Sequence, residues 1–213
     1  MTTRRSLLTS AFALFAAVAC GGVQRPVAGQ APAKGAATYP GRYPFTAADI
    51  NFITGMIGHH AQAIVMARWA PTHGASRSVG ILCERIINAQ QDEITLMQSW
   101  LRDRSQPVPE AKPGPMKMMM NGMEHEMLMP GMLTEQQMKE LDQARGNEFD
   151  RLFLTDMIQH HKGAVAMVEQ LFGTSGAGQD EAIFKFASDV NVDQTTEIDR
   201  MQIMLTSLPR KLR

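Results

Sequence analysis

The sequence predicts an all-α protein, a four-helix bundle made of two duplicated helical hairpins that a long crossover joins. Three observations predict this fold class. Two parts of the chain resemble each other, apolar residues recur at helical spacing in both parts, and few stretches show the alternation that is typical of strands. About 170 residues follow the N-terminal region, which is enough for one domain with its own core.

The duplication is visible in two pairs of segments. Residues 52–67 (FITGMIGHHAQAIVMA) and 153–168 (FLTDMIQHHKGAVAMV) are identical at eight of sixteen positions, at an offset of 101 residues without a gap. A second pair follows, with QQDEITLMQSWL from Gln90 and QTTEIDRMQIML from Gln194. Because the order of the segments repeats, the sequence predicts two copies of one helical hairpin.

Residues 1–20 have the features of an export signal. An apolar run follows Arg4 and Arg5, is too short to cross a membrane, and ends in small residues before Cys20. Either a signal peptidase would cut before Cys20, or Cys20 would become the lipid-bearing first residue of a lipoprotein. The paired arginines also fit twin-arginine export. Residues 21–44, rich in glycine, alanine and proline, are predicted to be a flexible tether.

The bundle is predicted over residues 45–208, and its first hairpin over 45–105. Thr46 and Asp49 have the spacing of a capping box before the first helix, and Ser76 can begin the second. One face of each helix is apolar. These faces consist of Phe52, Met56, His59, Ala63, Met66 and Ala70 in the first helix, and of Cys83, Ile87, Gln90, Ile94, Met97 and Leu101 in the second.

Residues 106–133 are the predicted crossover, and eight of the chain's 17 methionines lie in it, between Met116 and Met132. Because proline and glycine interrupt this segment, we expect it to be irregular and to lie at the surface. Two interpretations stay open. The segment is either a hydrophobic lid over the bundle or a flexible second metal site, whose soft donors would be Met118, Met120, Met123, His125, Met127 and Met129.

The second hairpin is predicted over residues 134–208. Thr134 and Gln137 begin a short helical lead-in, and Gly146 allows a break before the repeated segment. The apolar faces consist of Phe153, Met157, His160, Ala164, Met167 and Leu171, and of Ala187, Val190 or Asn191, Gln194, Ile198, Met201 and Leu205.

The two Met-x-x-His-His segments are the predicted metal site. Residues three or four positions apart share a helix face, so Met56 lies beside His59 and His60. The duplication repeats this arrangement, and two-fold symmetry would bring the two sets together in the bundle. Imidazole suits copper, zinc, iron and nickel, whereas thioether selects soft ions, above all Cu(I). The predicted helical ligands are Met56, His59, His60, Met157, His160 and His161.

Other residues near this site are expected to play supporting parts. Gln90 and Gln194 could orient the second nitrogen of an imidazole, and Glu93 and Glu197, one turn further, could do the same. We expect the remaining helical methionines, His73 and Cys83 to take no part in binding. Met66, Met97, Met167 and Met201 are predicted to pack in the core, His73 to be solvated in its loop, and Cys83 to be a buried, inert thiol.

The composition excludes several classes of function. Lys and Arg number 21, as do Asp and Glu, so the net charge is zero and no basic surface for nucleic acid is indicated. No nucleophile constellation is visible, and the Glu-x-x-His motif of di-iron bundle enzymes does not occur in the sequence. We therefore expect a protein that is not an enzyme.

The motifs MIGHHAQAIVMA, MPGM and FDRLFLTDMIQHHKGAVAMV, together with the export signal, resemble the bacterial family of the domain of unknown function 305. The resemblance covers about residues 45–208. It implies a ferritin-like bundle and, because some members are described as exported copper-binding proteins, metal binding at the paired histidines.

From the residues and the resemblance we predict an exported copper buffer or carrier that contributes to copper homeostasis or tolerance in the periplasm or cell envelope. The expected ligand is copper, as Cu(I) or Cu(II), with zinc and iron as alternatives. The expected partners are the metal ion, a membrane only through lipid at Cys20, and an envelope protein or a second copy of the chain. The alternative functions are a structural or interaction module without metal, and a ferritin-like metal-dependent oxidase.

Overall fold

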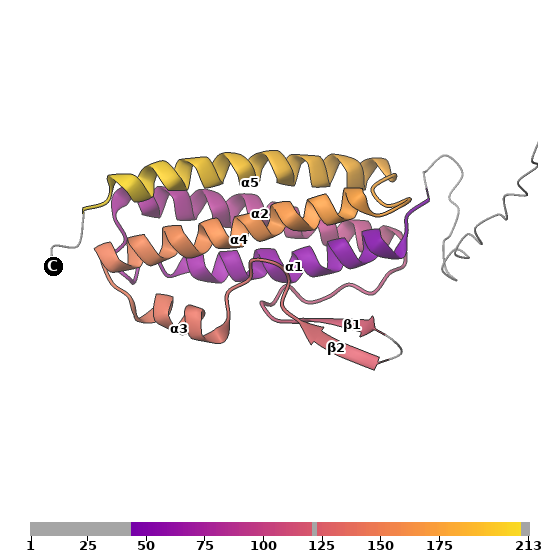
Figure 1. Cartoon of the computed structure of the whole chain (residues 1–213), viewed down its shortest axis with the longest axis horizontal. Helices are drawn as coiled ribbons and strands as arrows, with labels where there is room; N and C mark the ends of the chain where they lie inside the picture. The colour runs from indigo at the N-terminus through magenta and orange to yellow at the C-terminus, as the bar shows by residue number, and fades with distance from the viewer. Residues whose placement is uncertain (1–43, 121–122, 210–213) are drawn as a thin grey trace, which may run out of the picture. The chain divides into compact units, whose positions relative to one another are not determined.

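The computed structural model describes residues 44–209 except 121 and 122, without the side chains of residues 117–120 and 125. Four long helices form a bundle, as predicted (Figure 1). The predicted export signal, most of the tether and Cys20 lie outside the described residues. Within the described part, no helix is long and apolar enough to span a membrane.

The first hairpin consists of α1 (Ala47–Arg68) and α2 (Arg77–Asp103). The side chain of Thr46 accepts a hydrogen bond from the backbone of Asp49, whose carboxylate accepts one from the backbone of Thr46 in return, so the capping box forms as predicted. Ser76 caps α2, and its side chain accepts a hydrogen bond from the amide of Val79.

The second hairpin consists of α4 (Asn147–Gly173) and α5 (Glu181–Ser207), preceded by the short α3 (Glu135–Gln143). Thr134 and Gln137 form the second predicted capping box, and Asp180 caps α5. The helices α1 and α4 pack against each other and connect the two hairpins.

Two apolar clusters fill the interior, and the duplication relates their members. Phe52, Met56 and Met97 belong to one cluster, whereas their counterparts Phe153, Met157 and Met201 belong to the other. The first half of α1 thus packs with the second half of α4, and the second half of α1 with the first half of α4. The bundle therefore has the approximate two-fold symmetry that the repeat predicts.

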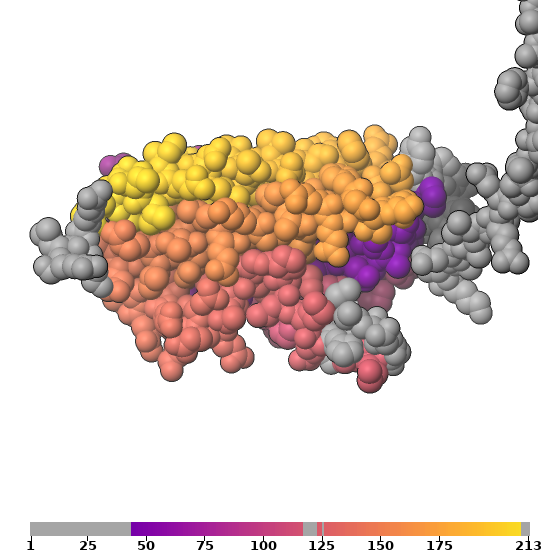
Figure 2. Space-filling model, in the orientation of Figure 1, coloured from indigo at the N-terminus to yellow at the C-terminus, as the bar shows by residue number. Residues whose placement is uncertain are grey.

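The proline and glycine residues of the crossover predict an irregular segment, but part of the crossover is regular. Strands β1 (Met116–Met120) and β2 (Met123–Met127) form an antiparallel hairpin, in which Met116 pairs with Met127 and Met120 with Met123. A signal for this hairpin was present in the sequence, because Asn-Gly between two short runs favours a two-residue hairpin loop. The crossover lies beneath α1 in Figure 1, and Figure 2 shows it, in rose, below α4 and beside the visible part of α1.

Candidate metal centre

Four histidines meet in the interior where α1 and α4 cross. His59 and His60 on α1, and His160 and His161 on α4, are all fully buried. The ring centroids of His59 and His160 lie 3.8 Å apart. The structure thus brings the two repeated histidine pairs together, and we name these four residues the histidine layer.

Carboxylates from the outer helices contact two rings of this layer. The Nε2 atom of His60 lies 2.8 Å from Oε2 of Glu93 on α2, and Nε2 of His161 lies 2.7 Å from Oε2 of Glu197 on α5. The second contact is a hydrogen bond, whereas the first has the distance of an ion pair without the alignment of a hydrogen bond. Such carboxylates orient an imidazole and leave its other nitrogen to act as a ligand.

The other two rings of the layer differ from each other. His59 Nε2 lies 3.0 Å from the carbonyl oxygen of Pro130 in the crossover, and the ring donates this hydrogen bond. Neither ring nitrogen of His160 has a hydrogen-bond partner. The crossover, which lies outside the repeat, therefore breaks the two-fold symmetry of the layer.

Unpaired polar atoms are concentrated around this layer. Buried polar atoms usually have hydrogen-bond partners. In the described part of the chain, every buried side-chain nitrogen or oxygen without one belongs to the four histidines or to Gln90, Glu93 and Gln194. Both polar atoms of the Gln90 side chain are unpaired, so Glu93, and not Gln90, supports His60. The unpaired imidazole nitrogens are therefore candidate metal donors.

Burial keeps the central rings neutral. Burial away from solvent lowers the pKa of His59 from 6.5 to about 3, and the electrostatic effect of His60 adds to the shift. The hydrogen bond to Pro130 opposes it. Burial and the neighbouring histidines likewise lower the pKa of His160 well below 6.5. At neutral pH both imidazoles therefore carry the free lone pair that metal binding requires.

The predicted methionine ligands lie on either side of the layer. Met56 and Met157 are fully buried and belong to different apolar clusters. No three His, Cys, Asp or Glu side chains in the described part are grouped closely enough to hold a metal ion. The four histidines thus meet without forming a finished coordination shell from these residue types, and their role as ligands stays a prediction.

The predicted loop donors are spread more widely. Met123 and Met127 are exposed, and Met129 is half-buried against the first apolar cluster. The side chains of Met118, Met120 and His125 lie outside the described residues, although the backbone register pairs Met118 with His125.

The prediction that His73 is solvated was wrong. His73 is buried, with its Nδ1 2.9 Å from Thr72 Oγ1 and its Nε2 2.9 Å from the carbonyl oxygen of Asp142. No local pattern in the sequence indicates this burial, because Asp142 is 69 residues away. Cys83 is buried, as predicted, and burial raises its pKa to about 12, so it remains a thiol.

The chain matches one protein family and resembles several solved structures. The model of the family described as "Domain of unknown function (DUF305)" matches residues 49–205. No curated protein matches the chain.

One similar structure is that of a DUF305 protein from Streptomyces coelicolor, which is named as a candidate secreted protein. Its TM-score is 0.64 and its sequence identity is 26%, and the match covers 78% of this chain and 96% of that one. A DUF305 fragment from Deinococcus radiodurans has a TM-score of 0.64, 27% identity, and coverage of 77% and 99%. CopM in its Cu(II)-bound form has a TM-score of 0.57, 28% identity, and coverage of 74% and 95%. CopM has also been solved with Cu(I) and with silver.

Proposed function

This chain belongs to the DUF305 family, and on that premise we propose that it is an exported copper-binding protein that buffers or carries copper in the bacterial cell envelope. One observation carries the proposal. Four fully buried histidines meet at the crossing of α1 and α4, and each has at least one ring nitrogen without a hydrogen-bond partner.

The chemistry of these donors favours copper. Imidazole binds copper in both oxidation states. The apolar clusters beside the histidine layer exclude water, and this exclusion favours an ion that needs few ligands. CopM, similar in fold and 27–28% identical, binds Cu(I), Cu(II) and silver. Zinc and iron are the competing ions for imidazole donors.

The role that we propose is binding rather than catalysis. The metal is cargo, held by imidazoles that Glu93, Glu197 and the Pro130 carbonyl orient. Export follows from the signal-like residues 1–20 and accords with the naming of one similar protein as a candidate secreted protein. In the envelope, Cys20 would attach the bundle to a membrane if it carries lipid.

A paired titration tests the proposal. Purified mature protein is titrated with Cu(I) and with Cu(II) beside the variant His59→Ala/His60→Ala/His160→Ala/His161→Ala. We expect the variant to lose at least one copper equivalent, because it lacks all four imidazole donors of the layer. Circular dichroism would establish that the variant keeps its helices.

His73→Gln provides the matched control, because His73 is also buried but has partners at both ring nitrogens. This variant should bind as much copper as the parent. Equal copper binding by the four-histidine variant and the parent would refute the histidine layer as the site. A stable protein with no affinity for copper, zinc or iron would favour an interaction module instead.

A further inference from the structure

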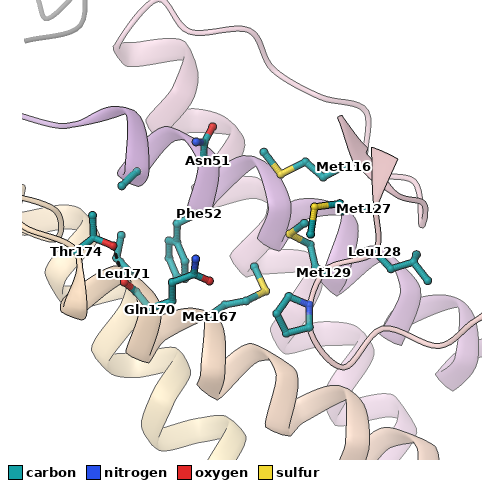
Figure 3. Close-up of a pocket in the computed structure, with 12 residues that line it drawn as sticks. Asn51, Phe52, Met116, Met127, Leu128, Met129, Met167, Gln170, Leu171 and Thr174 are labelled. Carbon is teal, nitrogen blue, oxygen red and sulfur yellow. Dashed lines mark hydrogen bonds between the residues drawn. The ribbon is translucent and has the colours of Figure 1, made fainter. Parts of the chain in front are cut away.

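A second cluster of soft donors lies where the β hairpin meets the bundle. A pocket of about 460 Å³ lies between the base of the β hairpin and the helices α1 and α4 (Figure 3). Four of its lining residues are methionines, namely Met116, Met127, Met129 and Met167. Figure 3 shows their sulfur atoms directed toward the same space, from β1, β2, the segment after β2 and α4.

A glycine on α1 brings two of these sulfurs close to the helix. A Cβ atom at Gly55 would lie 2.8 Å from Sδ of Met129 and 3.2 Å from Sδ of Met116. The two sulfurs therefore occupy the space that any other residue at position 55 would need. Met127 joins them because it is the cross-strand partner of Met116.

The donor chemistry of the pocket is selective. None of the described residues that line it is His, Cys, Asp or Glu. Its other side-chain heteroatoms belong to the neutral Asn51, Gln170 and Thr174. Zinc and Cu(II) prefer imidazole, thiolate or carboxylate ligands, whereas thioethers select soft monovalent ions.

This donor set differs from the one that the sequence predicts for the crossover. Met127 and Met129 belong to both sets. Met116 and Met167 join them from β1 and α4, whereas Met123 is exposed and lies outside the pocket. The pocket is next to the histidine layer, because Pro130 both lines the pocket and accepts the hydrogen bond from His59.

We propose that Met116, Met127, Met129 and Met167 form a second metal site, specific for monovalent soft ions and foremost for Cu(I). It binds the ion through thioether sulfur alone and does not require the histidine layer. It is separate from the site of the proposed function, and either one can fail without the other.

The test replaces the four pocket methionines by leucine, which preserves the apolar volume but removes the sulfur donors. Cu(I) is measured by anaerobic competition with a chromophoric Cu(I) chelator. We expect the leucine variant to lose one Cu(I) equivalent and to bind Zn(II) as the parent does. Met97→Leu/Met201→Leu, a pair of core methionines outside the pocket, is the matched control and should keep full Cu(I) binding.

X-ray absorption separates the two sites. In a His59→Ala/His60→Ala/His160→Ala/His161→Ala background, Cu(I) in the pocket should show sulfur neighbours, which disappear when the four leucines are added. An unchanged Cu(I) stoichiometry in the leucine variant would overturn the pocket site and leave the methionines as packing. Only nitrogen or oxygen neighbours in the histidine-deficient protein would also overturn it. Full Cu(I) binding in that protein, lost on adding the leucines, would instead count against the histidine layer.

Gly55→Ala tests the same site without removing a sulfur. The new Cβ would displace the flexible ends of Met129 and Met116, so the fold is retained while Cu(I) binding by the pocket weakens by roughly tenfold or more. Gly80→Ala is its control, since a Cβ at Gly80 on α2 meets no atom within 4 Å. Equal Cu(I) affinity of these two variants would contradict the proposed site.

Discussion

At the residue scale, the buried histidines differ in their hydrogen bonds and not in their burial. His73 is held at both ring nitrogens and packs against Phe149, with 5.1 Å between ring centroids. His160 is equally enclosed but has no hydrogen-bond partner at either nitrogen. A buried histidine with both nitrogens paired is explained by structure alone. The unpaired nitrogens of the histidine layer are what distinguish it as the candidate binding site.

Asp156 on α4 is a buried carboxyl that disfavours folding when it is charged. Burial raises the pKa of Asp156 from 3.8 to about 6, and the electrostatic effect of Glu140 is the second, smaller cause of this shift. Because the pKa of Asp156 is higher in the folded state than in the unfolded state, binding of a proton there stabilises the fold. This contribution is complete below pH 3.8, the unfolded-state pKa, and is lost as the pH rises through about 6, the folded-state pKa.

We therefore expect Asp156→Asn to increase the free energy of unfolding at pH 7.5, by about 1–3 kcal/mol. The difference from the parent should vanish below pH 3.8, where the parent carboxyl is protonated in both states. Urea denaturation at several pH values measures this. A difference that stays constant from pH 3.5 to pH 8 would show that the charge of Asp156 is not its cause.

At the scale of elements, the crossover is fixed to the bundle by polar and close backbone contacts. The side chain of Gln62 on α1 donates to the carbonyl of Leu133, at 3.0 Å, and accepts from its amide, at 2.7 Å. The corresponding position of the repeat on α4 is Gly163, and a Cβ there would lie 1.9 Å from the carbonyl oxygen of Pro130. The duplicated helices thus differ where the crossover contacts them.

Gly163→Ala should destabilise the protein because the crossover backbone must move away from α4. The expected loss is about 1–3 kcal/mol, despite the higher helix propensity of alanine. Gly80→Ala, at an open helical site, should instead leave the stability unchanged or increase it. Thermal denaturation of the two variants compares them. If both were equally stable, the crossover would not be held against α4 at Gly163.

At the scale of the whole bundle, two equivalent aspartates tie the hairpins together. Asp49, near the start of α1, accepts a hydrogen bond at 2.7 Å from the amide of Gly178 in the loop between α4 and α5. Asp150, near the start of α4, accepts one at 3.1 Å from the amide of Ser76, which precedes α2. Each hairpin thus contributes one buried carboxylate to the loop of the other, at opposite ends of the bundle (Figure 1).

Asp49→Ala and Asp150→Ala should each lower the free energy of unfolding by about 1–3 kcal/mol, because each leaves a loop amide without its acceptor. The two sites share no partner, so the double variant should lose the sum within about 0.5 kcal/mol. Urea denaturation of both single variants and the double variant tests this. A negligible loss in either single variant would show that its hydrogen bond does not hold the hairpins together.

Much of the fold follows from local patterns. The apolar face of α1, from Phe52 to Met66, is buried as predicted, since the helical period fixes which side chains share a face. The capping boxes at Thr46 and Thr134 likewise depend on residues three positions away. The β hairpin was not predicted, because proline and glycine around it favour an irregular segment.

By itself, the sequence determined the four helices, their buried faces and the meeting of the two His-His segments, because helical periodicity and duplication together imply this geometry. Only the tertiary structure decided what each ring contacts. Glu93 rather than Gln90 contacts His60, and the Pro130 carbonyl, 71 residues along the chain, contacts His59. The tertiary structure also decided that Met116 and Met167 share a pocket. Periodicity specifies the face on which a side chain lies, but its partner depends on how distant segments pack.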